Sequence, residues 1–135
     1  RDYGGRSAFC GPVTTLKVHE DNSLVRSALE ETGAGRVLVV DGGGSTRCAL
    51  VGDNLALLGS QNGWAGILVY GCIRDAAPIR EIDIGLKALA TNPRKSIKKG
   101  EGERDVNVRF AEVTIAPGDY LYADEDGVVV SERQL

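Results

Sequence analysis

Two short apolar runs constrain the fold of this chain more than any other feature. The first, "RVLVV", covers residues 36–40, and the second, "GILVYG", covers residues 66–71. Both are apolar at nearly every position, which is typical of a strand buried on both faces of a sheet. Between them, "GDNLALLGSQNG" at residues 52–63 predicts a helix. A strand, a helix and a strand in this order favour parallel pairing with a right-handed crossover.

The residues before this unit predict another strand and another helix. Residues 10–18, "CGPVTTLKV", alternate in polarity and are rich in β-branched side chains, so they predict a strand. Asp21 or Asn22 can cap a helix whose apolar residues follow the helical period and which ends near Gly33. Residues 46–51 are compatible with either a short extended piece or a short helical piece.

The C-terminal third has a different pattern. A strand around residues 86–90 is followed by short alternating segments separated by turns, which is typical of an antiparallel sheet. These segments are "VNVRF", "VTI", "YLYAD" and "GVVVS". The sequence therefore predicts the α/β class, with a parallel and an antiparallel sheet in one domain over residues 1–135. Because the chain starts at Arg1 and contains no methionine, we expect a further segment before it.

Charge, hydropathy and cysteine content argue against several classes of function. A formal net charge of −3 gives no support for general binding to nucleic acid. No apolar run approaches the ~20 residues that span a bilayer. Cys10, Cys48 and Cys72 are an odd number, and their spacing fits neither a disulfide framework nor a zinc site. We predict reduced thiols in a cytoplasmic protein.

The stretch "VVDGGGS" at residues 39–45 raises the question of a nucleotide or S-adenosylmethionine site. Its three glycines are consecutive, whereas dinucleotide-binding turns space them as G-x-G-x-x-G and place an acid about 20 residues later. A P-loop is excluded because no Gly-Lys-Ser/Thr follows. We interpret this stretch as a sharp turn after a central strand.

A stronger candidate site combines two short segments. "GDNL", residues 52–55, places free backbone N–H groups and the positive end of a helix dipole where a small carboxylate could bind. Arg74 and Asp75 follow the second buried strand, where ligands gather in parallel sheets. An arginine can clamp an anion and an aspartate can bind a hard metal ion. A surface ion pair or a helix cap would explain the same two residues equally well.

Across nearly its whole length the sequence resembles the RraA family, named for the regulator of ribonuclease activity A. The resemblance is carried by "GGRSAFCGPVTTLKVHEDN", "RVLVVDGGGS", "GDNLA", "GCIRDAAPIREIDIGLKAL" and "PGDYLYADEDGVVVS". It extends to the class II aldolases that cleave 4-hydroxy-4-methyl-2-oxoglutarate and decarboxylate oxaloacetate. Their signature is an aspartate, twenty residues, then Arg-Asp, and here Asp53 is followed by twenty residues and then Arg74-Asp75.

The resemblance implies a fold and a site. The fold is a three-layer β/β/α swivelling domain, and members assemble as trimers or hexamers with the site between subunits. Asp75 would bind a divalent cation, Mg²⁺ or Mn²⁺. Arg74 would bind the keto or enolate oxygen, Asp53 would orient a water, and the substrate carboxylate would bind at Gly52, Asp53, Asn54 and Leu55.

The implied function is a pyruvate-forming lyase acting on a small keto acid. The alternative is a regulatory protein that binds and inhibits a ribonuclease E-type ribonuclease. Some members are named demethylmenaquinone methyltransferases, a role against which the glycine turn argues. Longer aldolases carry a C-terminal extension that adds an acidic residue to the neighbouring site, so the resemblance supports decarboxylation more strongly than aldol cleavage.

Three further features have simple structural explanations, and a fourth is a further candidate for the site. His19 is expected at the surface or at a helix cap, and Trp64 is expected to pack between layers. The basic run at residues 93–104 is expected to be a solvated loop, with lysines that could also line an intersubunit rim or attract anionic substrates. Arg47, directly after the glycine turn, is a candidate for a second role at the site.

Overall fold

The centre of the structure is formed by β2 (Val37–Asp41) and β4 (Gly66–Ile73), which run parallel as the two apolar runs predict. The computed structural model describes residues 1–135. Helix α2 (Asp53–Gln61) lies between these two strands in the chain. Alternate residues of β2 enter two different cores. Leu38 and Val40 belong to the core beneath the helices, and Val37 and Val39 belong to the other. This sheet is therefore the middle of three layers.

Three more strands complete the parallel part of the sheet. β1 (Phe9–Lys17) pairs with β2, while β3 (Ala49–Val51) and β5 (Gly85–Thr91) both pair with β4. β2 pairs with β4 only as far as Tyr70, and β3 then takes the same edge at Cys72 and Ile73. The piece at residues 46–51 is thus extended where it joins the sheet.

Three helices cover one face of this sheet, namely α1 (Ser23–Leu29), α2 and α3 (Ala76–Ile79). The core beneath them contains 19 buried residues, including Trp64, whose indole N–H donates to the carbonyl of Glu31. None of the helices has the length and apolarity needed to cross a membrane. The sequence did not predict α3, which has only four residues.

Helix α1 is shorter than the sequence predicts. It ends at Leu29 and not near Gly33, because the chain tightens into a turn in which the N–H of Glu31 donates to the carbonyl of Ala28. Asn22 is the N-cap residue but makes no side-chain cap bond, and the carboxylate of the preceding Asp21 accepts the N–H of Ser23 at 2.9 Å.

The third layer consists of antiparallel strands. β9 (Tyr120–Ala123) and β10 (Val128–Ser131) pair with each other, and β9 also pairs with β1. β7 (Val108–Phe110) and β8 (Val113–Ile115) form a separate two-stranded sheet, and the unpredicted β6 (Glu103–Arg104) pairs with β1.

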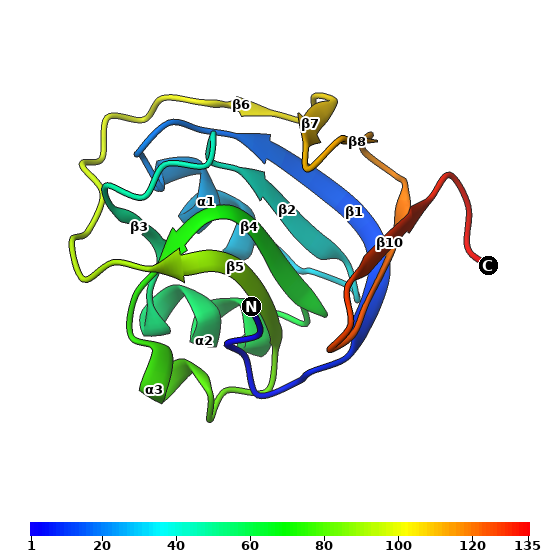
Figure 1. Cartoon of the computed structure of the whole chain (residues 1–135), viewed down its shortest axis with the longest axis horizontal. Helices are drawn as coiled ribbons and strands as arrows, with labels where there is room; N and C mark the ends of the chain where they lie inside the picture. The colour runs from blue at the N-terminus through cyan, green and yellow to red at the C-terminus, as the bar shows by residue number, and fades with distance from the viewer.

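The long strand β1 joins the parallel and antiparallel parts. Residues 13–17 pair in parallel with β2, and residues 9–12 pair antiparallel with β9. Figure 1 shows this arrangement, with β9 and β10 crossing the first half of β1 on the side away from α2 and α3. The expected mixed α/β architecture is confirmed, although the two kinds of pairing share one strand.

A pair of glycines makes room for an aromatic ring between two layers. Gly66 and Gly85 are register partners on β4 and β5, and the side chain of Phe9 lies across both. A Cβ on Gly85 would lie 2.0 Å from a ring carbon of Phe9, and one on Gly66 would lie 2.2 Å away. Any side chain at either position must displace a ring that is 7% exposed.

We therefore expect Gly85→Ala to destabilise the protein by about 1–3 kcal/mol, the usual cost of overpacking a core. Urea unfolding followed by circular dichroism measures the change. The matched control is Gly127→Ala, because Gly127 is exposed and a Cβ there meets no atom within 4 Å. Equal stability of the two variants would contradict the packing described here.

Candidate active site

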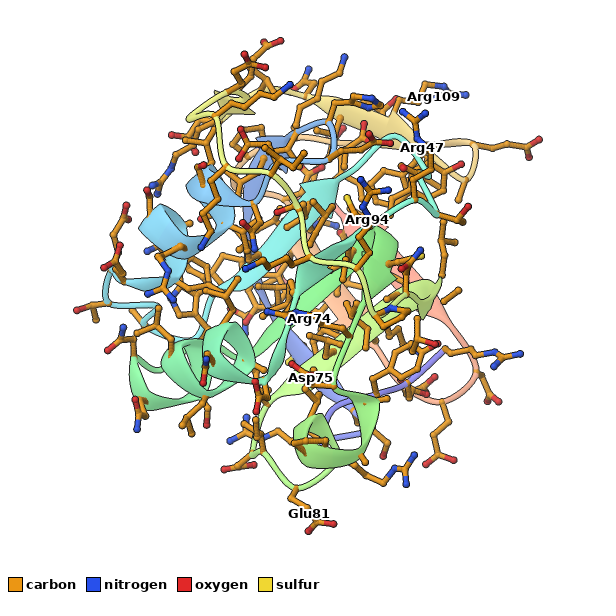
Figure 2. All side chains as sticks on the ribbon, turned by 90° about the vertical axis from the view of Figure 1, so that its left-hand side faces the viewer. Arg47, Arg74, Asp75, Glu81, Arg94 and Arg109 are labelled. Atoms are coloured by element: carbon orange, nitrogen blue, oxygen red, sulfur yellow. The ribbon has the colours of Figure 1, made fainter.

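The pairing of β3 with β4 places the two predicted site segments side by side. Val51 ends β3 and is the register partner of Ile73, which ends β4. The next residues, Gly52-Asp53 and Arg74-Asp75, therefore leave the sheet together. The N–H of Arg74 donates to the carbonyl of Val51 at 2.9 Å, which fixes this relation. Figure 2 shows Arg74 and Asp75 next to α2 and α3.

The carboxylate of Asp75 connects the two segments. Oδ2 of Asp75 accepts the N–H of Asp53 at 3.1 Å and lies 4.0 Å from Nε of Arg74. A Cβ on Gly52 would lie 2.9 Å from the same oxygen and 3.1 Å from the same nitrogen. Only glycine at position 52 lets the carboxylate and the guanidinium approach the first turn of α2 this closely.

The backbone of Asp75 is strained. Its φ of 61° and ψ of 43° are left-handed, a conformation that non-glycine residues adopt rarely and that is often found at functional sites. Asp75 occupies the N-cap position of α3 but makes no side-chain cap bond there. Its carboxylate instead accepts the first N–H of α2, so it satisfies the N-terminus of that helix and not of its own.

The predicted anion-binding amides already have partners within the chain. Asp75 accepts the N–H of Asp53, and Oδ1 of Asp53 accepts the N–H of Asn54 at 2.8 Å. Leu55 is the third residue of the helix, so its N–H has no intrahelical acceptor. A bound carboxylate would have to share or displace the two side-chain carboxylates.

These residues line a small pocket of about 130 Å³. The sequence predicted five of its lining residues: Gly52, Asp53, Asn54, Leu55 and Arg74. It did not predict the other three, which are Asn22, Arg26 and Lys98. The available signals were Lys98 within the basic run and the four-residue spacing of Asn22 and Arg26, which places them on one face of a helix.

The pocket is cationic, and one of its lining residues has an unsatisfied polar atom. Arg26, Arg74 and Lys98 carry three positive charges, whereas Asp53 has the only carboxylate among the lining residues. The carboxylate of Asp75, 4.0 Å from Arg74, lies beside the pocket. Oδ1 of Asn22 is buried without a hydrogen-bond partner, although Nδ2 of the same residue donates to the carbonyl of Leu50.

Asp75 is suited to a metal ion that needs few protein ligands. No group of three or more His, Cys, Asp or Glu side chains in the chain could hold a metal. The carboxylate of Asp75 is one-third exposed, and its distance from Arg74 is too long for a hydrogen bond. Mg²⁺ commonly keeps several waters and binds through one or two carboxylates plus substrate, so this donor set fits such an ion.

Arg47 lies in a different pocket. Its Nε is 2.6 Å from Oε2 of Glu20, and hydrogen bonds from Arg47 and then Ser45 lower the pKa of Glu20 to about 2. Together with His19, which is exposed as expected, this pair lines a pocket of about 320 Å³ next to the basic loop. The structure does not bring Arg47 together with Arg74 and Asp75.

The glycine turn makes its hydrogen bonds within the chain. The N–H groups of Gly42 and Gly44 both donate to the carbonyl of Tyr70, and that of Gly43 donates to Asp41. Gly43 and Gly44 have positive φ, as a sharp turn requires. The interpretation of this stretch as a turn after a central strand is confirmed.

Comparison with known proteins identifies the family. The profile of the RraA-like (aldolase/RraA) family matches residues 1–130. The chain belongs to the RraA-like family. A relative from Alkalilimnicola ehrlichii, provisionally named 4-hydroxy-4-methyl-2-oxoglutarate aldolase, is 67% identical over 100% of this chain and 84% of its own length.

Two solved RraA-like structures have the same fold and bear other names. The RNA-processing inhibitor RraA from Thermus thermophilis is 52% identical, with a TM-score of 0.99 over 100% of this chain and 82% of its own. A protein from Geobacillus kaustophilus HTA426, named S-adenosylmethionine: 2-dimethylmenaquinone methyltransferase, is also 52% identical, with a TM-score of 0.98 over 100% and 84% of the two chains. Fold similarity therefore does not decide among the three functions in the names of these relatives, which are aldolase, RNA-processing inhibitor and methyltransferase.

In this RraA-like chain a buried aspartate positions the loop that carries Lys98. Asp21 is 2% exposed and accepts the N–H of Lys99 at 2.8 Å and of Glu101 at 3.1 Å. Its other oxygen accepts the N–H and hydroxyl of Ser23. Burial alone would raise the pKa of Asp21, but the bonds from Ser23, Glu101 and Lys99 lower it to about 2.

This lowered pKa predicts a pH dependence of folding stability. The native state favours ionised Asp21, so its contribution is present above pH ~4 and is lost as the pH falls toward 2. We expect Asp21→Asn to reduce the free energy of unfolding by roughly 2 kcal/mol at pH 6 and by much less at pH 2.5. Urea titrations at several pH values measure both. Asp126→Asn, on an exposed turn, is the control. A difference that does not change with pH would contradict this role of Asp21.

Proposed function

We propose that this RraA-like protein is a divalent-metal-dependent lyase that forms pyruvate from small keto acids. One observation carries the proposal: Asp53, Arg74 and Asp75 converge at the first turn of α2, beside a cationic pocket. The pocket is far smaller than the ~300–1,000 Å³ typical of sites for drug-sized ligands, so it suits a small metabolite. The aldolase name of the relative from Alkalilimnicola ehrlichii supports the same class of reaction.

The two candidate reactions share one difficulty, the formation of a pyruvate enolate. Decarboxylation of oxaloacetate releases CO₂, and the electrons of the broken C–C bond move to the keto oxygen. Aldol cleavage of 4-hydroxy-4-methyl-2-oxoglutarate breaks the C3–C4 bond and removes the proton of the C4 hydroxyl, leaving the same enolate beside a second pyruvate. In both cases the enolate carbon then takes up a proton.

The residues of the chain can assist each stage. Arg74 donates hydrogen bonds to the oxygen on which negative charge develops, and stabilisation of this type often contributes more to catalysis than any other effect. Lys98 and the free N–H of Leu55 bind the carboxylate next to the keto group. Asp53 orients the water that exchanges protons with the substrate.

Asp75 would hold the divalent cation. A bound Mg²⁺ or Mn²⁺ supplies Lewis-acid stabilisation of the developing negative charge, worth several kcal/mol. The bond from the N–H of Asp53 to Oδ2 orients the carboxylate of Asp75, much as outer-shell partners orient metal ligands. Gly52 keeps the space beside that oxygen clear.

The glycine turn supports a lyase over a methyltransferase. The backbone N–H groups at positions 42, 43 and 44 are all engaged within the chain, so they offer no cradle for the polar groups of a cofactor. The turn therefore gives no support for the methyltransferase activity in the name of the Geobacillus kaustophilus relative.

The proposal predicts metal-dependent formation of pyruvate from oxaloacetate. We expect Asp75→Ala to lower kcat/KM by at least 100-fold, which corresponds to the loss of about 3 kcal/mol of transition-state stabilisation. Asp75→Asn, which keeps an acceptor for the N–H of Asp53, should lose nearly as much. A coupled pyruvate assay measures this after subtraction of a blank with metal and no protein, because metal ions alone decarboxylate oxaloacetate.

Asp126→Asn is the control for these variants and should match the unchanged protein. Absence of turnover above the blank with either Mg²⁺ or Mn²⁺ would contradict the proposal. Undiminished turnover in Asp75→Ala would contradict the role assigned to that residue.

A second function, inhibition of a ribonuclease, is favoured by one comparison, the relative from Thermus thermophilis that is named an RNA-processing inhibitor. The Asp75→Asn variant separates the two functions. If the chain is a ribonuclease regulator, it should slow RNA cleavage by a ribonuclease E-type enzyme, and the variant should do so equally well. If the protein acts only as a lyase, neither form should change the rate of RNA cleavage.

A further inference from the structure

One cation of the candidate pocket has no role in the enolate chemistry. Arg26 lies on α1 and lines the pocket together with Asn22, which is one helical turn earlier. Arg74 and Lys98 reach the same pocket from the end of β4 and from the basic loop. Arg26 is exposed and forms no ion pair with a carboxylate of the chain. Its guanidinium is therefore available to a ligand.

The charge balance of the pocket favours a ligand with more than one carboxylate. Three cations line the pocket with one carboxylate, that of Asp53, and the Asp75 carboxylate near Arg74 is the one assigned to the metal ion. A keto acid with one carboxylate, bound by Arg74 and Lys98, would leave the charge of Arg26 unmatched. An arginine fork forms two parallel hydrogen bonds with a carboxylate, which adds geometric selectivity to the attraction.

We propose that Arg26 is a specificity-determining residue that binds the carboxylate of the departing fragment of the substrate. This inference rests on the proposed function. It assigns the side of the pocket formed by Arg26 of α1 to the part of the substrate remote from the enolate. In aldol cleavage of 4-hydroxy-4-methyl-2-oxoglutarate that carboxylate survives in the second pyruvate. In decarboxylation of oxaloacetate the equivalent carboxylate is itself lost as CO₂.

This difference means that the loss of Arg26 should affect kcat differently in the two reactions. For the aldol substrate, the contact with Arg26 persists through bond cleavage, so its loss should raise KM and leave kcat little changed. For oxaloacetate, a cation at the departing carboxylate stabilises the bound substrate more than the transition state, because the negative charge leaves that group. Loss of the contact should then raise KM and also raise kcat.

Binding measurements test the inference without requiring turnover. Calorimetric titration with 2-oxoglutarate is compared with titration with pyruvate, both in Mg²⁺. 2-Oxoglutarate has the keto group and both carboxylates of the aldol substrate but lacks its C4 hydroxyl and methyl groups, so it cannot be cleaved. We expect Arg26→Gln to weaken the binding of 2-oxoglutarate by about 10- to 100-fold and that of pyruvate by less than twofold. Arg26→Lys keeps the positive charge but not the two parallel hydrogen bonds of the guanidinium, so its affinity for 2-oxoglutarate should lie between those of the unchanged protein and Arg26→Gln. Arg80→Gln, an exposed arginine outside the pocket, is the matched control.

Kinetic measurements on the same variants supply the second readout. We expect Arg26→Gln to raise KM for 4-hydroxy-4-methyl-2-oxoglutarate about 10-fold or more with kcat within threefold, and to raise both KM and kcat for oxaloacetate. Equal weakening of pyruvate and 2-oxoglutarate binding, or no weakening of either, would overturn the inference. If the unchanged protein binds 2-oxoglutarate through Arg26 but forms no pyruvate, the proposed lyase function fails, and Arg26 is then the residue that binds the second carboxylate of a dicarboxylate ligand.

Discussion

The candidate site depends on the short parallel pairing between β3 and β4. Because Val51 and Ile73 are partners at the ends of these strands, the chain leaves the sheet at two neighbouring points. One exit leads into α2 and the other into the Arg74-Asp75 turn. The twenty residues between Asp53 and Arg74 are the length of chain needed to form α2, return along β4 and reach the same edge. The long-range signature is thus a consequence of the βαβ crossover.

Close approach at this edge requires both a missing side chain and a strained backbone. Gly52 lets the carboxylate of Asp75 reach the first turn of α2, and the left-handed conformation of Asp75 aims that carboxylate away from its own helix. Either feature alone would have a simple structural explanation. Together they place a partly exposed carboxylate, a guanidinium and helix N–H groups beside a small cationic pocket, an arrangement suited to keto-acid chemistry.

Much of this arrangement could be predicted from local sequence. The two apolar runs predicted β2 and β4, and the apolar pattern predicted α2. The segments at residues 52–55 and 74–75 predicted five of the residues that line the pocket, and the spacing between Asp53 and Arg74-Asp75 came from the resemblance to the RraA family. The side of the pocket formed by Asn22, Arg26 and Lys98 could not be predicted. These residues come together because Asp21 accepts hydrogen bonds from backbone groups 78 and 80 residues away. Likewise, the occupation of the Asp53 and Asn54 amides by carboxylates of the chain depends on side-chain positions that no sequence pattern encodes.

The central claim is that the carboxylate of Asp75 and the guanidinium of Arg74 act on one ligand. A crystal structure with Mn²⁺ and oxalate, a stable analogue of the pyruvate enolate, tests it most directly, because the anomalous signal of manganese locates the ion independently of the protein. The account predicts a manganese peak about 2.0–2.3 Å from an oxygen of Asp75 and oxalate within hydrogen-bond distance of Arg74. Manganese bound elsewhere, or oxalate out of reach of Arg74, would contradict it.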